Sequence, residues 1–163
     1  MPAVIRLLSS CFFALLLISC AATDSRYPDG SYRSAVDDDS GNYKYGPWRL
    51  RQNEGLDAIN LLLDESDVLI QNSAYNAATD KLERVLRIKP DYAPAWSRLS
   101  WLALQTNSAT RSIQMAKRSN SFAYSDPELQ SLNWTFIQSA SQMLQDEDTY
   151  NEALQQIESL KAF

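Results

Sequence analysis

Histidine is absent from this chain of 163 residues, and cysteine and glycine are scarce, with 2 and 4 occurrences. Without histidine, the chain lacks the usual general base and the commonest zinc ligand, so neither a Ser-His-Asp nor a Cys-His catalytic arrangement can form. The few glycines do not form a phosphate-cradling loop. We therefore expect no catalytic, cofactor or metal site, and no enzymatic activity.

Basic charge is also in short supply. The chain has 15 Lys and Arg residues against 20 Asp and Glu residues, a net charge of -5 and a pI of about 4.7. A basic face supplies most of the affinity for nucleic acid, so nucleic-acid binding is excluded. The acidic run at Asp37–Asn42 lacks the closing glutamate of an EF-hand loop and is better explained as a solvated linker than as a calcium site.

The stretch from Leu7 to Ile18 is mostly apolar, with Ser9, Ser10 and Cys11 interspersed, and it is too short for a membrane-spanning helix, which needs roughly 20 apolar residues. It follows Arg6, the only charged residue before Cys20. A basic start, a short apolar stretch and small residues at its end are typical of a secretory signal. The alternatives are an ordinary signal peptide with an incidental cysteine, or a buried N-terminal helix.

The residues that end this run, Leu17-Ile18-Ser19-Cys20, resemble the lipobox of bacterial lipoproteins. The resemblance implies that residues 1–19 are a cleaved lipoprotein signal peptide, and that Cys20 is acylated on its thiol and on the new amino group. Several acyl chains together anchor a protein stably to a bilayer. Ala21, rather than Asp, follows the cysteine, which in such lipoproteins implies an outer-membrane protein that faces the periplasm.

Residues 20–56 have the composition of a disordered tether that begins at the lipidated cysteine. The segment is rich in Asp, Ser, Gly and Tyr and has no sustained helical or strand period, so too little apolar surface is available to offset the entropy of ordering. About 36 residues span roughly 120–130 Å when fully extended. Tyr43, Tyr45 and Trp48 stand apart, because aromatic side chains can pack on a folded domain or contact a partner, and the sequence leaves both open.

Residues 57–163 follow a helical period, with apolar side chains three and four residues apart. Breaks are expected at Asn72-Ser73, at Lys89-Pro90 and at Asn107-Ser108. Asp57 is a candidate cap of the first helix, Asp91 and Pro94 open the third, and Asp126-Pro127 opens the fifth. The last two helices are expected at about Pro127 to Gln145 and Thr149 to Leu160.

The six predicted helices contain an internal repeat. A shift of 34 residues aligns five pairs of positions: Leu62 with Trp96, Ser66 with Ser100, Leu69 with Ala103, Ala78 with Ser112 and Leu82 with Ala116. A further shift of 41 places Ser100 on Ser141, Ser112 on Ala153 and Ala116 on Ile157. This period resembles the tetratricopeptide repeat, as do Trp96-x-x-Leu99-Ser100 and the stretch from Ala78 to Pro90. The resemblance implies an all-α fold of about three tetratricopeptide-like helix-turn-helix repeats in a short right-handed solenoid, in which one concave face binds partners.

A closer resemblance concerns the segments "LERVLRIKPDYAPAWSRLSWLAL", "MAKRSNSFA" and "LQSLNWTFI". They are similar to the LpoP-type lipoproteins, which are small tetratricopeptide proteins of the outer membrane. The resemblance covers roughly residues 56–145. It implies that the chain binds and activates a bifunctional peptidoglycan synthase, a class A penicillin-binding protein. We expect the chain to be a monomer.

The candidate partner contacts are polar or aromatic side chains off the buried stripe. They are Arg98, Trp101, Asn120, Asn133 and Trp134. Trp96 is expected in the core. For Trp101 and Trp134 core packing and partner contact are both open, and for Asn120 and Asn133 a local capping role is the alternative. Two other functions also remain: a pilotin-like lipoprotein that carries a secretin subunit, and a scaffold for envelope assembly that changes no enzyme's rate.

Overall fold

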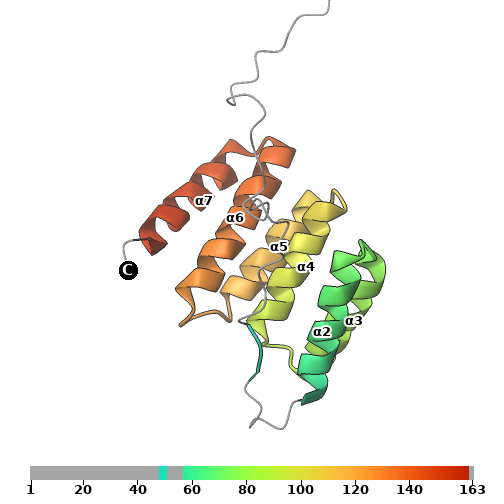
Figure 1. The fold of residues 1–163 in the computed structure, drawn as a ribbon. Helices are drawn as coiled ribbons and strands as arrows, with labels where there is room; N and C mark the ends of the chain where they lie inside the picture. Colours follow the sequence, from blue (N-terminus) through green and yellow to red (C-terminus); the bar gives the residue numbers. More distant parts are fainter. Residues whose placement is uncertain (1–47, 51–56, 162–163) are drawn as a thin grey trace, which may run out of the picture. The chain divides into compact units, whose positions relative to one another are not determined.

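The computed structural model describes residues 48–50 and 57–161, all of which belong to the compact unit Arg33–Phe163. Within these residues the secondary structure is α-helical, with six helices and no strand (Figure 1), so the all-α prediction is confirmed. The helices are α2 (Asp57–Gln71), α3 (Tyr75–Ile88), α4 (Ala93–Gln105), α5 (Ala109–Asn120), α6 (Pro127–Leu144) and α7 (Glu147–Leu160). None of them is both long and apolar enough to cross a membrane. The predicted signal peptide, Cys20, Tyr43 and Tyr45 lie outside the described residues.

Side-chain caps define the starts of α6 and α7, whereas Asp57, the predicted cap of the first helix, is itself the first residue of α2. Asp126 caps α6 as predicted, since its Oδ1 accepts a hydrogen bond from the backbone N–H of Leu129 at 2.9 Å. Helix α7 begins two residues before the predicted Thr149. Its cap is Asp146, whose carboxylate accepts hydrogen bonds from both the N–H and the hydroxyl of Thr149. Helix α4 starts after Tyr92, one residue later than Asp91 suggested, with Pro94 in its first turn.

The turns inside the three helical pairs share one backbone motif. Each contains a residue other than glycine in the left-handed region, namely Ser73, Asn107 or Gln145, with φ of 57°, 54° and 57°. In each turn the N–H of the following residue bonds a carbonyl five positions back: Ala74 to Leu69, Ser108 to Ala103, and Asp146 to Ser141. This is the Schellman ending of a helix. The α2–α3, α4–α5 and α6–α7 pairs therefore turn in equivalent ways.

Nine of the positions that the sequence repeat aligned are also equivalent in burial, whereas the pairs Leu62 with Trp96 and Leu69 with Ala103 each combine a buried with a partly exposed side chain. All nine are buried: Ser66, Ser100 and Ser141; Ala78, Ser112 and Ala153; Leu82, Ala116 and Ile157. The Ser100 hydroxyl donates to the Ser112 carbonyl oxygen at 2.9 Å, so these two helices meet at small side chains. A larger residue at such a crossing would hold the helices apart.

Each helix packs on the next along the chain, and α4 also contacts α6. The largest fully buried apolar side chains come from α2, α3 and α6: Ile59, Leu63, Leu82, Val85, Leu129, Phe136 and Ile137. Trp96 packs against this core with part of its ring exposed, and its indole N–H donates to the carbonyl oxygen of Pro90 at 2.8 Å. The core thus joins the helical pairs into one cluster.

Candidate partner-binding surfaces

Arg98, one of the predicted contacts, lies fully buried in α4. Its Nε donates to Asp67 Oδ1 of α2 at 3.1 Å, and its Nη1 donates to the carbonyl oxygen of Pro94 at 3.2 Å. The expectation that Arg98 lies off the buried stripe is therefore wrong. The physical reason is Asp67 of α2. Its carboxylate provides the opposite charge that a buried guanidinium needs.

Trp101 is also buried, with 8% of its surface exposed. Its ring contacts the ring of Tyr75 at the start of α3, with the centroids 5.9 Å apart and the planes at 87°. This edge-to-face geometry is a favourable aromatic pairing. Of the two alternatives that the sequence left open for Trp101, its position is that of core packing.

Asn133 and Asn120 meet where α5 ends and α6 passes it. Asn133 is fully buried, and its Nδ2 donates to Ser119 Oγ at 2.8 Å and to Asn120 Oδ1 at 2.7 Å. Ser119 in turn donates to the carbonyl oxygen of Ala93 at 2.8 Å. Two of the three segments that carried the closer resemblance, "MAKRSNSFA" and "LQSLNWTFI", are thus joined in a polar network that fastens α5 to α4 and α6.

Trp134 and Asn120 are the two predicted contacts with partial exposure. Trp134 packs against the core from α6. The structure therefore does not bring the five predicted residues together on one exposed surface, because Arg98, Trp101 and Asn133 are interior.

A segment before the first helix, Trp48–Leu50, lies against the domain. The Trp48 indole N–H donates to Asp126 Oδ2 at 2.6 Å, and the Tyr92 hydroxyl donates to the Trp48 carbonyl oxygen at 2.9 Å. The Asn60 side-chain amide bonds both backbone groups of Leu50: Oδ1 accepts from its N–H at 3.0 Å and Nδ2 donates to its carbonyl oxygen at 2.9 Å. Of the two alternatives for Trp48, packing on the folded domain is the one observed.

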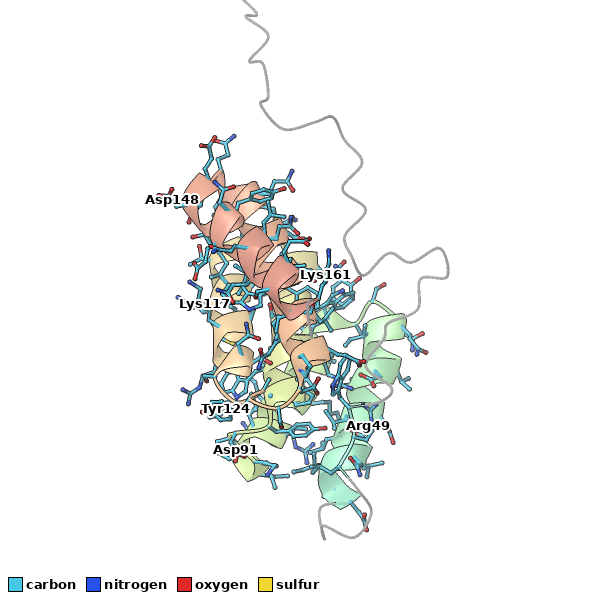
Figure 2. All side chains as sticks on the ribbon, turned by 90° about the vertical axis from the view of Figure 1, so that its left-hand side faces the viewer. Arg49, Asp91, Lys117, Tyr124, Asp148 and Lys161 are labelled. Atoms are coloured by element: carbon cyan, nitrogen blue, oxygen red, sulfur yellow. The ribbon has the colours of Figure 1, made fainter. Side chains whose placement is uncertain are left out.

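Arg49 is the charged member of this segment, and Figure 2 shows it beside α2. Its guanidinium pairs with Asp67 and, at 3.1 Å, with Asp64. Burial lowers the pKa of Arg49, but the hydrogen bonds and charges of Asp67 and Asp64 outweigh burial and raise the pKa overall. Asp67 therefore serves two arginines, Arg49 from the segment and Arg98 from the core.

A second surface is a groove between α3 and α5, floored by α4. It consists of two adjoining cavities of about 400 and 420 Å³ that share Leu99 and Arg111. Its floor consists of the apolar side chains of Trp96, Leu99, Leu102 and Ala103, of which the last three are at most 4% exposed. From Asn76 to Arg87 on α3 it runs for roughly 16 Å at the rise of an α-helix. We call this surface the α3–α5 groove.

The walls of the α3–α5 groove carry both signs of charge. Asp80, Glu83 and Arg87 line it from α3, and Arg111 lines it from α5. Glu83 and Arg111 face each other across the groove, 3.6 Å apart and about half exposed. An apolar floor between charged, exposed walls is the composition of a protein-binding surface, with its apolar centre and polar rim.

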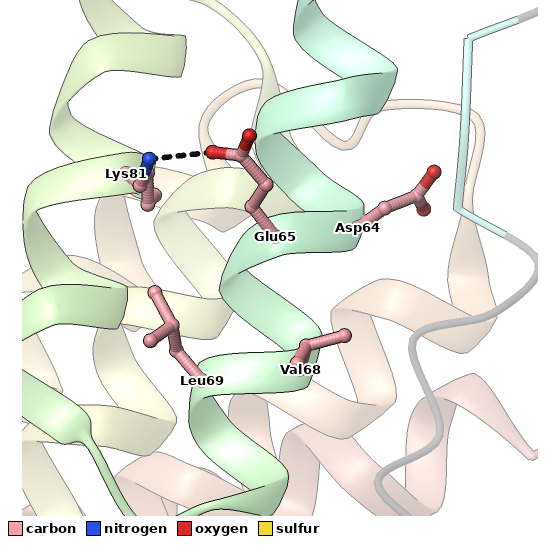
Figure 3. A pocket seen from close by; sticks show the side chains of 5 residues that line it. All are labelled: Asp64, Glu65, Val68, Leu69 and Lys81. Atoms are coloured by element: carbon pink, nitrogen blue, oxygen red, sulfur yellow. Dashed lines mark hydrogen bonds and ion pairs between the residues drawn. The ribbon is translucent and has the colours of Figure 1, made fainter.

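A third depression, of about 440 Å³, lies between α2 and α3 (Figure 3). Val68 and Leu69 give it an apolar surface, and the Lys81–Glu65 ion pair closes one side at 2.5 Å. Val68 is 55% exposed on the outer side of α2. This depression belongs to the first helical pair.

Among the described residues no three His, Cys, Asp or Glu side chains are grouped so that they could hold a metal ion. A scan of protein-family models finds no match to the chain, and a search of curated proteins finds none either. The function therefore has to be inferred from the geometry of the three surfaces described above.

Sequence reasoning missed both the α3–α5 groove and the role of Asn60. The groove residues of α3 do follow a helical spacing, at 76, 79, 80, 83, 86 and 87. That spacing borders the buried stripe of Ala78, Leu82 and Val85, and it could have been found. Asn60 gives no such signal, because its pairing with Leu50 depends on where a segment of irregular backbone lies.

Proposed function

We propose that this chain is an outer-membrane lipoprotein, anchored through Cys20, whose helical domain binds and activates a bifunctional peptidoglycan synthase. The observation that carries the binding role is the α3–α5 groove, an open surface with an apolar floor and charged walls. The similarity of the sequence to LpoP-type lipoproteins supports the choice of a class A penicillin-binding protein as partner.

In this proposal the three helical pairs are tetratricopeptide-like repeats in a short right-handed solenoid. The shared Schellman turns and the equivalent burial of the aligned small residues support the assignment. Repeats of this kind bury their apolar faces against their neighbours, and they leave extended surfaces free for partners.

Activation would follow from differential binding. A docked domain that prefers the active conformer of the synthase shifts its population toward that conformer, whereas equal affinity for both conformers shifts nothing. Complete reversal of a 1:99 equilibrium needs about 5.5 kcal/mol of preference, and a smaller preference shifts a smaller part of the population. The docking surface therefore has to contact a part of the synthase that differs between the two conformers.

The test is to add the purified full-length chain, in detergent, to the class A synthase of the same cell and to follow glycan polymerisation and crosslinking. We expect a rate increase that saturates with added chain. The chain used should include residues 48–50, because they contact α2, α4 and the cap of α6.

Charge reversal in the groove locates the surface. Arg111→Glu and Glu83→Arg should each weaken activation, and the double exchange should recover part of it. Lys117→Glu is the matched control, since Lys117 and Glu152 are 3.8 Å apart with similar exposure but lie outside the groove. Trp101→Ala is unsuitable as a binding probe, because the loss of its buried ring will also reduce stability.

The other outcomes separate the rival functions. Tight binding without any change in rate would replace activation by a scaffold role. Absence of binding to the synthase, together with binding to a secretin subunit, would favour the pilotin-like function. If the Arg111→Glu and Lys117→Glu variants activated the synthase equally well, the α3–α5 groove would not be the docking surface.

A further inference from the structure

We propose that the domain has a second binding site, for a short peptide with an aromatic, an arginine and an aliphatic residue in succession. In the free protein this site is filled by the chain's own Trp48-Arg49-Leu50. The site is made of Asn60, Asp64 and Asp67 of α2, Tyr92, and Asp126. It shares no residue with the α3–α5 groove, and it does not depend on a synthase being the partner.

The backbone contacts are those of peptide recognition. Asn60 presents one acceptor and one donor to the N–H and the carbonyl oxygen of the same residue, Leu50. An amide side chain used in this way makes the pair of hydrogen bonds that a neighbouring strand would make, and it holds the backbone whatever the side chain of that residue is. The Tyr92 hydroxyl adds a third backbone contact at the carbonyl of Trp48.

The side-chain contacts provide selectivity. Asp64 and Asp67 together form an acidic subsite for one guanidinium. Arginine fits this subsite better than lysine, because a planar group with several N–H donors can bond two carboxylates at once. Asp126 Oδ2 accepts the indole N–H, and Trp48 and Leu50 both pack against the core cluster. These features select the order aromatic, arginine, aliphatic.

The site is preformed, because two of its three carboxylates keep a partner in the domain when the segment leaves. Asp126 Oδ1 still accepts from the N–H of Leu129, and Asp67 Oδ1 still accepts from Arg98. Tyr92 is 6% exposed and is tied to Lys89 through its backbone N–H. Release of Trp48–Leu50 therefore breaks contacts to the segment without removing a cap or a core pair.

Exchange with an external peptide is governed by effective concentration. A segment joined to its site by a short connection competes at an effective concentration in the millimolar range. A free peptide of the same sequence should therefore bind weakly to the intact chain and at least about tenfold more tightly once the internal segment cannot occupy the site.

The experiment uses a fluorescein-labelled synthetic peptide of residues 45–52, YGPWRLRQ, and fluorescence polarisation. It is titrated into the full-length chain in detergent, and into the same chain carrying Trp48→Ala and Arg49→Ala, with detergent alone as the blank. We expect binding to the double variant at least about tenfold tighter than to the unmodified chain. A peptide with alanine at both the Trp and Arg positions should bind neither.

Site variants are made in the double-variant background. Asn60→Ala removes the backbone contacts and Asp64→Ala removes one carboxylate, and each should weaken peptide binding severalfold. Asn151→Ala, on the exposed side of α7, and Tyr124→Phe, at an 83% exposed side chain, are the matched controls and should leave binding unchanged. Circular dichroism at 222 nm confirms that each variant is helical.

A second measurement keeps the proposal testable if the double variant does not fold. In the ¹⁵N-labelled unmodified chain, excess unlabelled peptide should shift the indole resonance of Trp48 as the segment is displaced. No shift at millimolar peptide, or no binding by a folded double variant, would overturn the proposal. Peptide binding that is unchanged by Asn60→Ala and by Asp64→Ala would also overturn the proposal. The same holds if two copies of the chain associate by exchanging their Trp48–Leu50 segments.

Discussion

Removal of Asp67 should cost far more stability than removal of any other acidic residue on α2. Arg98 has no exposed side-chain surface, and the Asp67 side chain is 14% exposed. The two groups meet at 3.1 Å and 3.5 Å through two nitrogens of the guanidinium. Asp67→Ala leaves a buried guanidinium without this carboxylate, which typically costs about 3–5 kcal/mol. That is a large part of the roughly 5–15 kcal/mol that stabilises a domain.

Two further variants determine whether the stranded charge is the cause. Asp64→Ala removes a carboxylate that is 66% exposed and pairs with Arg49 alone among the ion pairs described, so it should cost at most about 1 kcal/mol. Arg98→Met removes the charge and keeps most of the volume, and Asp67 keeps Arg49, so the cost should stay below that of Asp67→Ala. Most decisively, Arg98→Met should rescue much of the loss when it is combined with Asp67→Ala.

The assay is urea unfolding followed by circular dichroism at 222 nm, with an unchanged m-value required for each variant. The reasoning fails if Asp67→Ala costs less than about 1 kcal/mol, which is the range of an exposed pair. It also fails if the double variant is as unstable as the sum of the single variants, because additivity means that the two side chains do not interact.

Three further predictions concern the turns and crossings. Gln145→Gly should stabilise the protein by about 0.5–1 kcal/mol, because glycine accepts positive φ without steric cost, and thermal unfolding should show a higher midpoint. Hydrogen bonds from the Thr149 hydroxyl and N–H lower the pKa of Asp146 below 3.8, so its contribution is present above that value and is lost as pH falls through the folded-state pKa. Thr149→Val should therefore lower the urea midpoint at pH 7, and the difference from the unmodified chain should shrink at pH 3. Ser112→Leu should cost at least about 1–3 kcal/mol by overpacking a helix crossing, whereas Thr110→Leu, at an exposed position of the same helix, should change the urea midpoint little.

The helices were predictable because their determinants are local. Spacing of apolar residues, Pro127 after Asp126, and the breaks at Asn72-Ser73 and Asn107-Ser108 all act within a few residues of one another. The error at the start of α7 has the same origin. Asp146, Glu147 and Asp148 are three acidic residues in a row, and the hydrogen bonds to Thr149 select the first of them as the cap.

The predictions that failed concern contacts between residues on different helices. Arg98 stands on α4 beside Trp96 and Leu99 with the pattern of a surface residue, and only the position of Asp67, 31 residues earlier, allows its burial. Asn133 was placed near a possible surface for the same reason, since its contacts with Ser119 and Asn120 join α6 to α5. The spacing of residues in the sequence shows which side chains share a face of one helix. It does not show which charged or amide side chain of another helix will contact that face.

The two proposed sites can act independently, because they use different side chains. The peptide site is built from α2, Tyr92 and Asp126, whereas the groove lies between α3 and α5. Arg111→Glu should therefore weaken activation of the synthase and leave peptide binding unchanged. Asn60→Ala should weaken peptide binding and leave activation unchanged. If both variants impaired both activities, the sites would be coupled, and the internal segment would control access to the groove. The pair of substitutions thus tests whether release of Trp48–Leu50 is a separate event or a step in docking.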